Sequence, residues 1–190
     1  MGLARELRIR SKPMLIAANK VDVPGVGENL RRLKELFPQY TVIPCSAEAE
    51  LALREAKRTG AVEYLPGDGG FAVGKATDKQ AQALAFIRKN VLDPFGSTGV
   101  QQVLNTAVFG LLRYKAVYPA GVARLEDKEG RVLPDCFLLP PQTTALDFAY
   151  KLHTDFGKNF VKAINAKTRL PVGKEYVLKD GDVIEIMARK

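Results

Sequence analysis

The sequence has no tryptophan, one histidine and two cysteines among its 190 residues. With a single histidine and no Cys-x-x-Cys pair, the chain cannot assemble an ordinary zinc site, and we expect no metal ligands. The cysteines, Cys45 and Cys136, lie far apart in apolar stretches. They are therefore expected to be buried free thiols rather than a disulfide, which is typical of a reducing compartment.

Long apolar runs are also missing. No stretch of eighteen residues is apolar throughout, so the sequence predicts no membrane-spanning helix and no membrane partner. The first ten residues are charged throughout and lack the apolar core of a signal peptide. We therefore expect a cytoplasmic protein. The apolar fraction of 46% is that of a folded chain with one or two small domains.

Basic residues outnumber acidic residues by 29 to 21, which gives a formal net charge of +8. A surplus of this size fits a nucleic-acid or ribonucleoprotein partner. It also fits a lysine-rich surface in water. Because no block of like charge stands out, charge alone slightly favours the solvated surface.

A short apolar run at residues 14–18 ends in Asn19-Lys20-Val21-Asp22. This pattern is typical of a buried strand that carries polar side chains at its carboxyl end, where open α/β sheets bind ligands. Asn-Lys-x-Asp suits guanine, because a carboxylate can accept hydrogen bonds from the ring N–H and the exocyclic amine. The lysine stem can cover the flat base, and the asparagine can tie neighbouring loops together. Adenine would leave the aspartate unpaired, which is costly.

By itself the tetrapeptide fits equally well a strand end followed by a polar loop. A second stretch, residues 40–45, is apolar and β-branched and ends in Ser46-Ala47-Glu48, and residues 28–37 between the two have helical spacing. Together they predict a parallel βαβ unit with a polar loop at each strand end. This unit resembles the guanine-specificity half of a GTPase domain. The resemblance implies a guanine site formed by Asn19, Lys20, Asp22, Ser46 and Ala47, in which a backbone N–H of the second loop meets the guanine oxygen.

The middle of the chain has helical patterns separated by glycine-rich loops. We expect helices at residues 3–10, 50–59, 78–92 and 100–112, with Gly60 after the second and Ser97 or Thr98 capping the last.

One glycine-rich loop, at residues 66–77, holds a near match to a phosphate loop, in which Gly69 is followed after four residues by Gly74-Lys75. The match fails because Ala76 stands where a magnesium-binding hydroxyl is needed and no strand leads in. We therefore expect a surface loop there.

Beyond residue 114 the period changes to that of strands. Residues 116–125 and 132–139 predict a hairpin around the turn at 127–130. Thr144 and Asp147 predict a capping box at the start of a helix that ends near Gly157, and strands follow at 160–164 and 183–186. This order predicts a small β-grasp module, with one helix lying across a sheet.

The run from Leu139 to Gly157, together with Lys179-Asp180-Gly181-Asp182, closely resembles a TGS domain. That module is shared by threonyl-tRNA synthetases, certain GTPases and SpoT-type enzymes. The likeness covers nearly all of residues 117–188. It implies docking to RNA, to the ribosome or to a protein partner.

Within this module, His153 could contact RNA or act as an acid–base group. Its spacing on the helix favours a packed, hydrogen-bonded side chain instead. Five basic residues could form a phosphate-binding patch or a solvated face, and interruption by Asp147 and Asp155 favours the solvated face. They are Lys151, Lys158, Lys162, Lys167 and Arg169.

The guanine motifs followed by a TGS domain resemble the C-terminal half of an Obg-related GTPase of the archaeal YchF-like branch. The resemblance implies three parts: the end of a GTPase-type α/β domain at 1–65, a loop and helical segment at 66–113, and the β-grasp TGS domain at 114–190. It implies GTP as the ligand, with Mg²⁺ only in a complete parent protein. Because the phosphate loop and switch segments have no counterpart, we expect a fragment or a misassigned start.

Two expectations follow from this resemblance. The chain should neither hydrolyse GTP nor bind it tightly, because phosphoryl transfer depends on the phosphate loop and its Mg²⁺ ligands. An incomplete sheet should also self-associate through an exposed edge, or rearrange. The alternative function is a stand-alone RNA- or protein-binding TGS module in which the GTPase-like part is only a scaffold.

Overall fold

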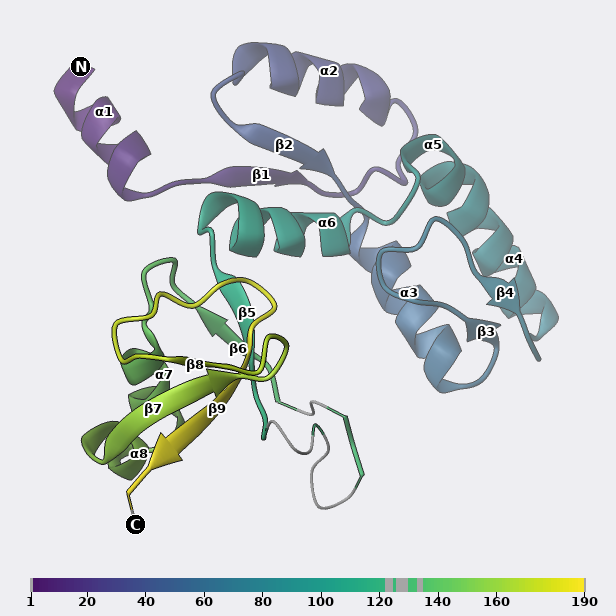
Figure 1. Ribbon diagram of the computed structural model, residues 1–190. Helices are drawn as coiled ribbons and strands as arrows, with labels where there is room; N and C mark the ends of the chain where they lie inside the picture. The colour runs from purple at the N-terminus through teal and green to yellow at the C-terminus, as the bar shows by residue number, and fades with distance from the viewer. Residues whose placement is uncertain (1, 122–124, 126–129, 133–134, 190) are drawn as a thin grey trace. The chain divides into compact units, whose positions relative to one another are not determined.

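The computed structural model describes residues 2–121, 125, 130–132 and 135–189. The chain divides into two compact units, Met1–Leu111 and Leu112–Lys190. Each unit has its own hydrophobic core. None of the helices in the described part is both long and apolar enough to cross a membrane. Figure 1 shows the elements of each unit.

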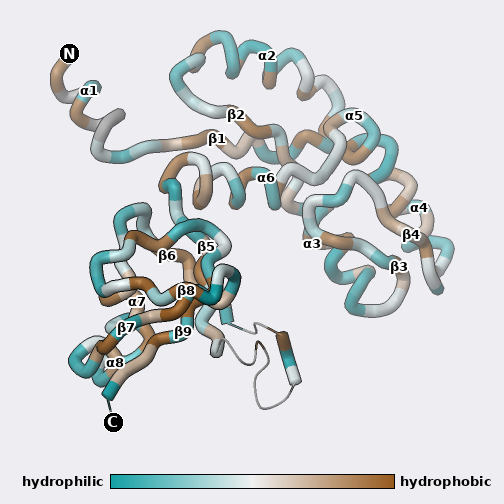
Figure 2. Tube along the Cα trace, in the orientation of Figure 1, coloured by the Kyte–Doolittle hydropathy of each residue, from teal (hydrophilic) through white to brown (hydrophobic). Residues whose placement is uncertain are grey.

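The first unit begins with two parallel strands joined by a helix, which confirms the predicted βαβ unit. Strand β1 pairs with β2 from Leu15↔Thr41 to Ala18↔Pro44, and Figure 2 shows β1 in hydrophobic colours. Within the described chain this sheet has two strands, and no β1 residue is fully buried. The elements are α1 (Gly2–Ser11), β1 (Leu15–Ala18), α2 (Val26–Leu36), β2 (Thr41–Pro44) and α3 (Ala47–Arg58).

The rest of the first unit is more irregular than the sequence predicts. Two short antiparallel strands, β3 (Val62–Glu63) and β4 (Ala72–Val73), lie in and next to the predicted surface loop. Both long helices end in π-helical segments, so neither is a continuous α-helix. The elements are α4 (Asp78–Ile87), η1 (Arg88–Leu92), α5 (Asp93–Phe95), α6 (Val100–Asn105) and η2 (Thr106–Leu111).

The predicted cap of α6 is wrong. Gly99 is the N-cap residue and has a φ of 77°, while the Thr98 side chain is fully buried and bonds elsewhere. In contrast, α4 begins with a full capping box between Thr77 and Gln80.

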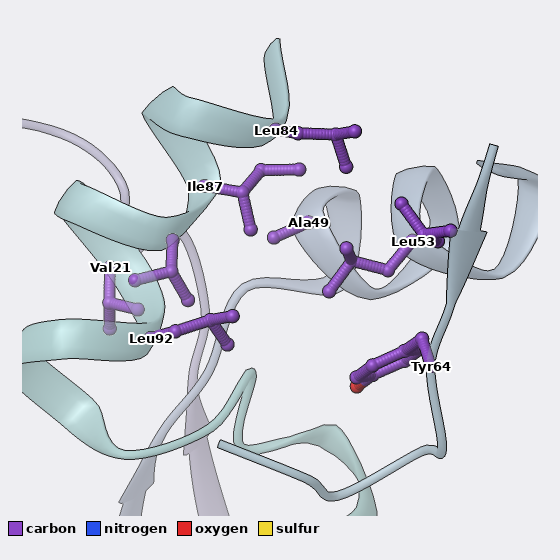
Figure 3. Close-up of a cluster of buried hydrophobic side chains, with 9 residues drawn as sticks. Val21, Ala49, Leu53, Tyr64, Leu84, Ile87 and Leu92 are labelled. Carbon is purple, nitrogen blue, oxygen red and sulfur yellow. The ribbon is translucent and has the colours of Figure 1, made fainter. Parts of the chain in front are cut away.

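The core of the first unit lies where α3 packs against α4 and η1. Figure 3 shows Ala49 and Leu53 of α3 facing Ile87 and Leu84, with Tyr64 beside them. Val21, from the Asn-Lys-x-Asp loop, belongs to the same cluster and is 3% exposed. The polar loop is therefore fixed to the core by its one apolar residue.

The second unit is a five-stranded sheet in the order β6-β5-β9-β7-β8, with α7 and α8. Strand β5 is parallel to β9, and the other neighbouring pairs are antiparallel. This is the β-grasp fold expected from the sequence, with β8 in a segment predicted as a connector. The elements are β5 (Lys115–Pro119), β6 (Phe137–Leu139), α7 (Ala145–Leu152), α8 (Thr154–Lys158), β7 (Phe160–Asn165), β8 (Leu170–Val172) and β9 (Val183–Ala188).

The capping box of α7 is present as predicted, since Thr144 accepts from the Asp147 N–H and Asp147 accepts from the Thr144 N–H. The core includes Val117, Leu139 and Phe148, each fully buried. Most of the predicted turn at 127–130 lies outside the described residues.

Two expectations about single side chains are wrong. His153 is not packed: its side chain is 64% exposed, and its Nδ1 accepts from the Asp155 N–H at 3.2 Å as the N-cap of α8. The helical spacing that placed it inward stops at Leu152, where α7 ends. Cys136 is exposed and precedes β6, whereas Cys45 is buried as expected.

Candidate functional site

The Asn-Lys-x-Asp loop continues directly from β1 and is held beside the end of β2 by backbone hydrogen bonds. The Cys45 N–H donates to Ala18 O at 2.9 Å, and the Val21 N–H donates to Cys45 O at 3.2 Å. Lys20 between them has a φ of 70°, in the left-handed region that lysine rarely adopts. This conformation lets Val21 enter the core while Lys20 stays exposed.

Ser46 joins the two loops through its side chain. Its hydroxyl donates to Asp22 Oδ1 at 2.7 Å and accepts from the Ala49 N–H at 3.2 Å, so that Ser46 is also the N-cap of α3. A hydroxyl has one proton, and here the acceptor role leaves that proton for the carboxylate. The Asp22 side chain is therefore held by a directed hydrogen bond from a fully buried residue.

A second contact ties the loops together. Asn19 Oδ1 accepts from the Ala47 N–H at 3.0 Å, which is the tie that the sequence predicts for this asparagine. Ala47 is the first residue of α3 and is exposed. Its N–H lies at the positive end of a 12-residue helix, where partial negative charge is stabilised.

The structure thus brings the five predicted guanine-site residues to one edge of the sheet, but not into one cavity. Asp22 and Ser46 line a cavity of about 460 Å³, whose lining also includes Ala83 and Phe86 of α4. Asn19, Lys20 and Ala47 are not among its lining residues. Asp22 is partly buried, and those three residues are exposed.

In the segment at 69–75, which nearly matches a phosphate loop, the glycines allow close packing of the backbone. A Cβ on Gly69 would lie 2.7 Å from Gly96 O, and one on Gly74 would lie 2.7 Å from Gly60 O. The lysine that follows is not at a helix start, because α4 begins three residues later with its own capping box. The segment therefore lacks the strand–loop–helix geometry that cradles a phosphate.

Sequence reasoning missed a buried carboxylate behind the Ser46-Ala47 loop. Glu50 of α3 is 4% exposed, and it accepts from Thr98 Oγ1 at 2.6 Å, Tyr64 Oη at 2.7 Å and Arg54 Nε at 2.7 Å. Burial raises the pKa of the Glu50 carboxyl, but the hydrogen bonds from Thr98, Arg54 and Tyr64 outweigh burial and hold the pKa below its usual value. Glu50 is therefore ionised at neutral pH.

The five basic residues of the second unit are all exposed, but two of them, Lys158 and Lys167, lie far apart. Lys158 precedes β7 and Lys167 follows it, so the six-residue strand separates them by about 20 Å at a rise of about 3.3 Å per residue. Lys162 lies between them on the same strand. In the described part of the chain, no group of three or more His, Cys, Asp or Glu side chains could hold a metal ion.

Comparison with known families gives two adjacent matches. Residues 17–121 match the family described as "Obg-like GTPase YGR210-like, G4 motif-containing domain", and residues 128–188 match the TGS domain. A GTPase Obg of Desulfitobacterium hafniense is 44% identical over 59 residues, which are 28% of this chain and 14% of that protein.

Two longer relatives match almost the whole chain. An uncharacterised GTP-binding protein of Methanocaldococcus jannaschii is 44% identical over 192 residues, or 99% of this chain and 48% of that protein. The crystal structure of a GTP-binding protein from Pyrococcus horikoshii OT3 is 43% identical with a TM-score of 0.71, and the match covers 98% of this chain and 48% of that one. The chain therefore spans about half the length of these two relatives.

Proposed function

The chain belongs to the Obg-like GTPase family, YGR210-like type, with a TGS domain, and we propose that its first unit holds the guanine base of a nucleotide. The base would be held by the loops that follow β1 and β2. The residues are Asn19, Lys20, Asp22, Ser46 and Ala47. The hydrogen bond from Ser46 to Asp22 carries this proposal, because it fixes a carboxylate at the end of a parallel strand.

Asp22 is suited to the donor edge of guanine. A carboxylate has about four acceptor sites, and the Ser46 hydroxyl uses one of them. The remaining sites can accept from the ring N–H and the exocyclic amine. Adenine has no ring N–H at the corresponding position, so it would leave the remaining acceptor sites of this partly buried carboxylate unpaired.

The acceptor edge of guanine fits the start of α3. The exposed Ala47 N–H can donate to the guanine oxygen, sharing its hydrogen with Asn19 Oδ1 or replacing that contact. The α3 dipole adds to this preference, since it favours an oxygen with partial negative charge at Ala47. The aliphatic stem of the exposed Lys20 can lie over the face of the base.

These contacts give specificity more than affinity. The glycine-rich segment at 69–75 is used for backbone packing, so it adds no phosphate cradle to the site. We therefore expect the chain by itself to bind guanine nucleotides weakly, with a Kd in the millimolar range, and not to hydrolyse GTP.

An exchange of base specificity tests the proposal. Asp22→Asn turns one acceptor into a donor. This variant should therefore bind guanosine monophosphate more weakly than the unmodified chain does. It should bind xanthosine monophosphate, which carries a carbonyl in place of the amine, more tightly. Both can be titrated against amide chemical shifts. Asp68→Asn, an exposed change in the β3–β4 connection, is the matched control. Equal binding of guanosine and adenosine monophosphate by the unmodified chain would overturn the proposal.

For the second unit we propose contact with RNA through its exposed basic residues, of which Lys158, Lys162 and Lys167 lie along β7 and its flanks. The spread of these residues over about 20 Å suits an extended phosphate backbone better than a single phosphate group. A protein partner is the other outcome, and salt dependence separates the two.

We also propose that copies of the chain associate through the β1–β2 sheet. Parallel strands are normally buried on both faces, yet no β1 residue is fully buried and the described sheet ends after two strands. Open edges of this kind pair with other strands.

A further inference from the structure

We propose that Thr98 and Glu50 are positioning residues for guanine recognition, because they hold the Ser46-Ala47 loop in the place where it can fix Asp22. This inference rests on the proposed function and deepens it. Neither side chain is a base-contacting group, since each lies behind the loop in the interior of the first unit. Their effect would be transmitted through Ser46.

The first link in this arrangement is a backbone hydrogen bond. The Ser46 N–H donates to Thr98 O at 2.9 Å. Ser46 is the N-cap of α3, and its hydroxyl is the donor to Asp22. The position of the Thr98 carbonyl therefore affects the Asp22 carboxylate through Ser46, which contacts both.

The second link is the Thr98 side chain, which is fully buried. Its hydroxyl donates to Glu50 Oε2 at 2.6 Å. Glu50 lies one helical turn after Ser46 and donates its own N–H to Ser46 O at 3.1 Å. Ser46, Thr98 and Glu50 thus form a closed ring of hydrogen bonds, in which a buried carboxylate sets the distance between α3 and the 97–99 segment.

The third link is a close backbone approach. Gly99 has a φ of 77°, and a Cβ there would lie 2.0 Å from Pro44 O and 2.9 Å from Cys45 Cα. The 97–99 segment therefore lies directly against the end of β2. With this contact on one side and the ring of hydrogen bonds on the other, the strand end and the first turn of α3 have little freedom to move.

Tyr64 provides an internal control for this inference. Its hydroxyl donates to the same oxygen of Glu50 at 2.7 Å, and it is also buried, but it is not a member of the ring of hydrogen bonds that includes Ser46. Tyr64→Phe should reduce stability in the same way as Thr98→Val, because each removes one hydrogen bond to Glu50. Only the threonine change removes a link of the ring that includes Ser46.

The test compares guanosine monophosphate with inosine monophosphate, which lacks only the exocyclic amine, by chemical-shift titration of the 190-residue chain. The unmodified chain should prefer the guanosine compound by about tenfold, as expected for a hydrogen bond to a charged acceptor. In Thr98→Val this ratio should fall to about threefold or less. Thr98→Ser, which keeps the hydroxyl, and Tyr64→Phe should keep the original ratio.

The outcomes are distinguishable. If the unmodified chain shows no preference, the proposed base recognition itself fails. If it shows the preference and Thr98→Val keeps it, base recognition stands and the positioning role is overturned. Thr98→Ala removes the same hydroxyl without placing a methyl group against the carboxylate, and takes the place of Thr98→Val if that variant does not fold. If Tyr64→Phe lowers the preference for guanosine over inosine monophosphate as much as Thr98→Val does, the effect comes from a general loss of stability. That result would also overturn the positioning role.

Discussion

The hydroxyl of Ser46 lies 2.7 Å from Oδ1 of Asp22, although 24 residues separate them in the sequence. The same hydroxyl caps α3 by accepting from the Ala49 N–H. Helix stability and the orientation of the carboxylate thus depend on one atom. A change at Ser46 should therefore affect both.

Ser46→Ala should lower the free energy of unfolding by about 1 kcal/mol, as for the loss of an N-cap, and should lower the preference for guanosine over inosine monophosphate. Thr77→Ala is the matched control, because Thr77 caps α4 by accepting from the Gln80 N–H. It should cost similar stability and leave the preference unchanged. Urea unfolding and chemical-shift titration measure the two effects. An unchanged preference in Ser46→Ala would contradict the role given to this hydroxyl.

Gly99→Ala should be far more damaging than Gly60→Ala. Both glycines have a positive φ, near 75°, so alanine is strained by about 1 kcal/mol at either position. At Gly60 the new Cβ meets no atom within 4 Å, whereas at Gly99 it would meet the Pro44 carbonyl oxygen at 2.0 Å. We expect the Gly99 change to cost about 3 kcal/mol or more. Equal urea midpoints for the two variants would show that the strand end moves freely.

The stability of the first unit should depend on the ionisation of Glu50. Burial raises its pKa, but the hydrogen bonds outweigh burial, so the folded-state pKa lies below the usual value. The stabilisation is therefore complete above the ordinary pKa of glutamate, about 4.3, and is lost as the pH falls through the folded-state value. Urea unfolding from pH 7 to pH 3 should show a smaller loss of stability in Glu50→Gln than in the unmodified chain. If the free energy of unfolding falls equally with pH in both chains, ionisation of Glu50 does not contribute to stability.

Asp147 must be considered in the same experiment. Hydrogen bonds from the Thr144 backbone and side chain hold the pKa of its carboxyl below the usual value, so it also contributes stability that is lost at acid pH, below the ordinary pKa of aspartate, about 3.9. Asp147→Asn therefore serves as the comparison for the second unit. Each of the two variants should lose less free energy of unfolding between pH 7 and pH 3 than the unmodified chain does.

RNA binding by the second unit should weaken steeply as salt rises, because each phosphate contact releases counterions. The double variant Lys158→Glu, Lys167→Glu should weaken binding of a single-stranded RNA at low salt and flatten the salt dependence. Lys79→Glu with Lys89→Glu, on α4 and η1 of the first unit, is the control for net charge. If the affinity of the unmodified chain for RNA does not change with salt concentration, a protein partner is favoured instead.

Self-association through the β1–β2 sheet should respond to charge on the strand. Ala17 is exposed on β1, and Ala17→Lys should shift the chain toward the monomer in light scattering. Leu36→Lys removes a large exposed apolar side chain from α2 without changing a strand. If both variants reduce association equally, general apolar contact rather than strand pairing is responsible.

The sequence was sufficient for the parts of the fold that depend on local signals. The apolar run before Asn19 and the β-branched run before Ser46 have the period and polar ends of parallel strands, and both strands are present. The capping box at Thr144 has a fixed three-residue spacing and could be found in the same way. Each of these features lies within a few residues of its own signal.

Other features depend on contacts that no local pattern contains. Thr98 and Glu50 are 48 residues apart, and only the packing of the chain brings them together. Strands β3 and β4 have two residues each, too few to show a period. His153 was placed inward by a helical spacing that does not continue past Leu152, where the extended backbone of His153 begins the cap of α8.

The different environments of the two cysteines offer a way to observe the units separately. Cys136, in the second unit, is exposed and can be labelled with a thiol-reactive fluorophore in the folded chain. Cys45 is buried at the end of β2, and burial raises the pKa of its thiol, so less of the reactive thiolate is present. The reaction rate of Cys45 in an otherwise unmodified chain would therefore report how often the edge that carries Asp22 and Ser46 opens.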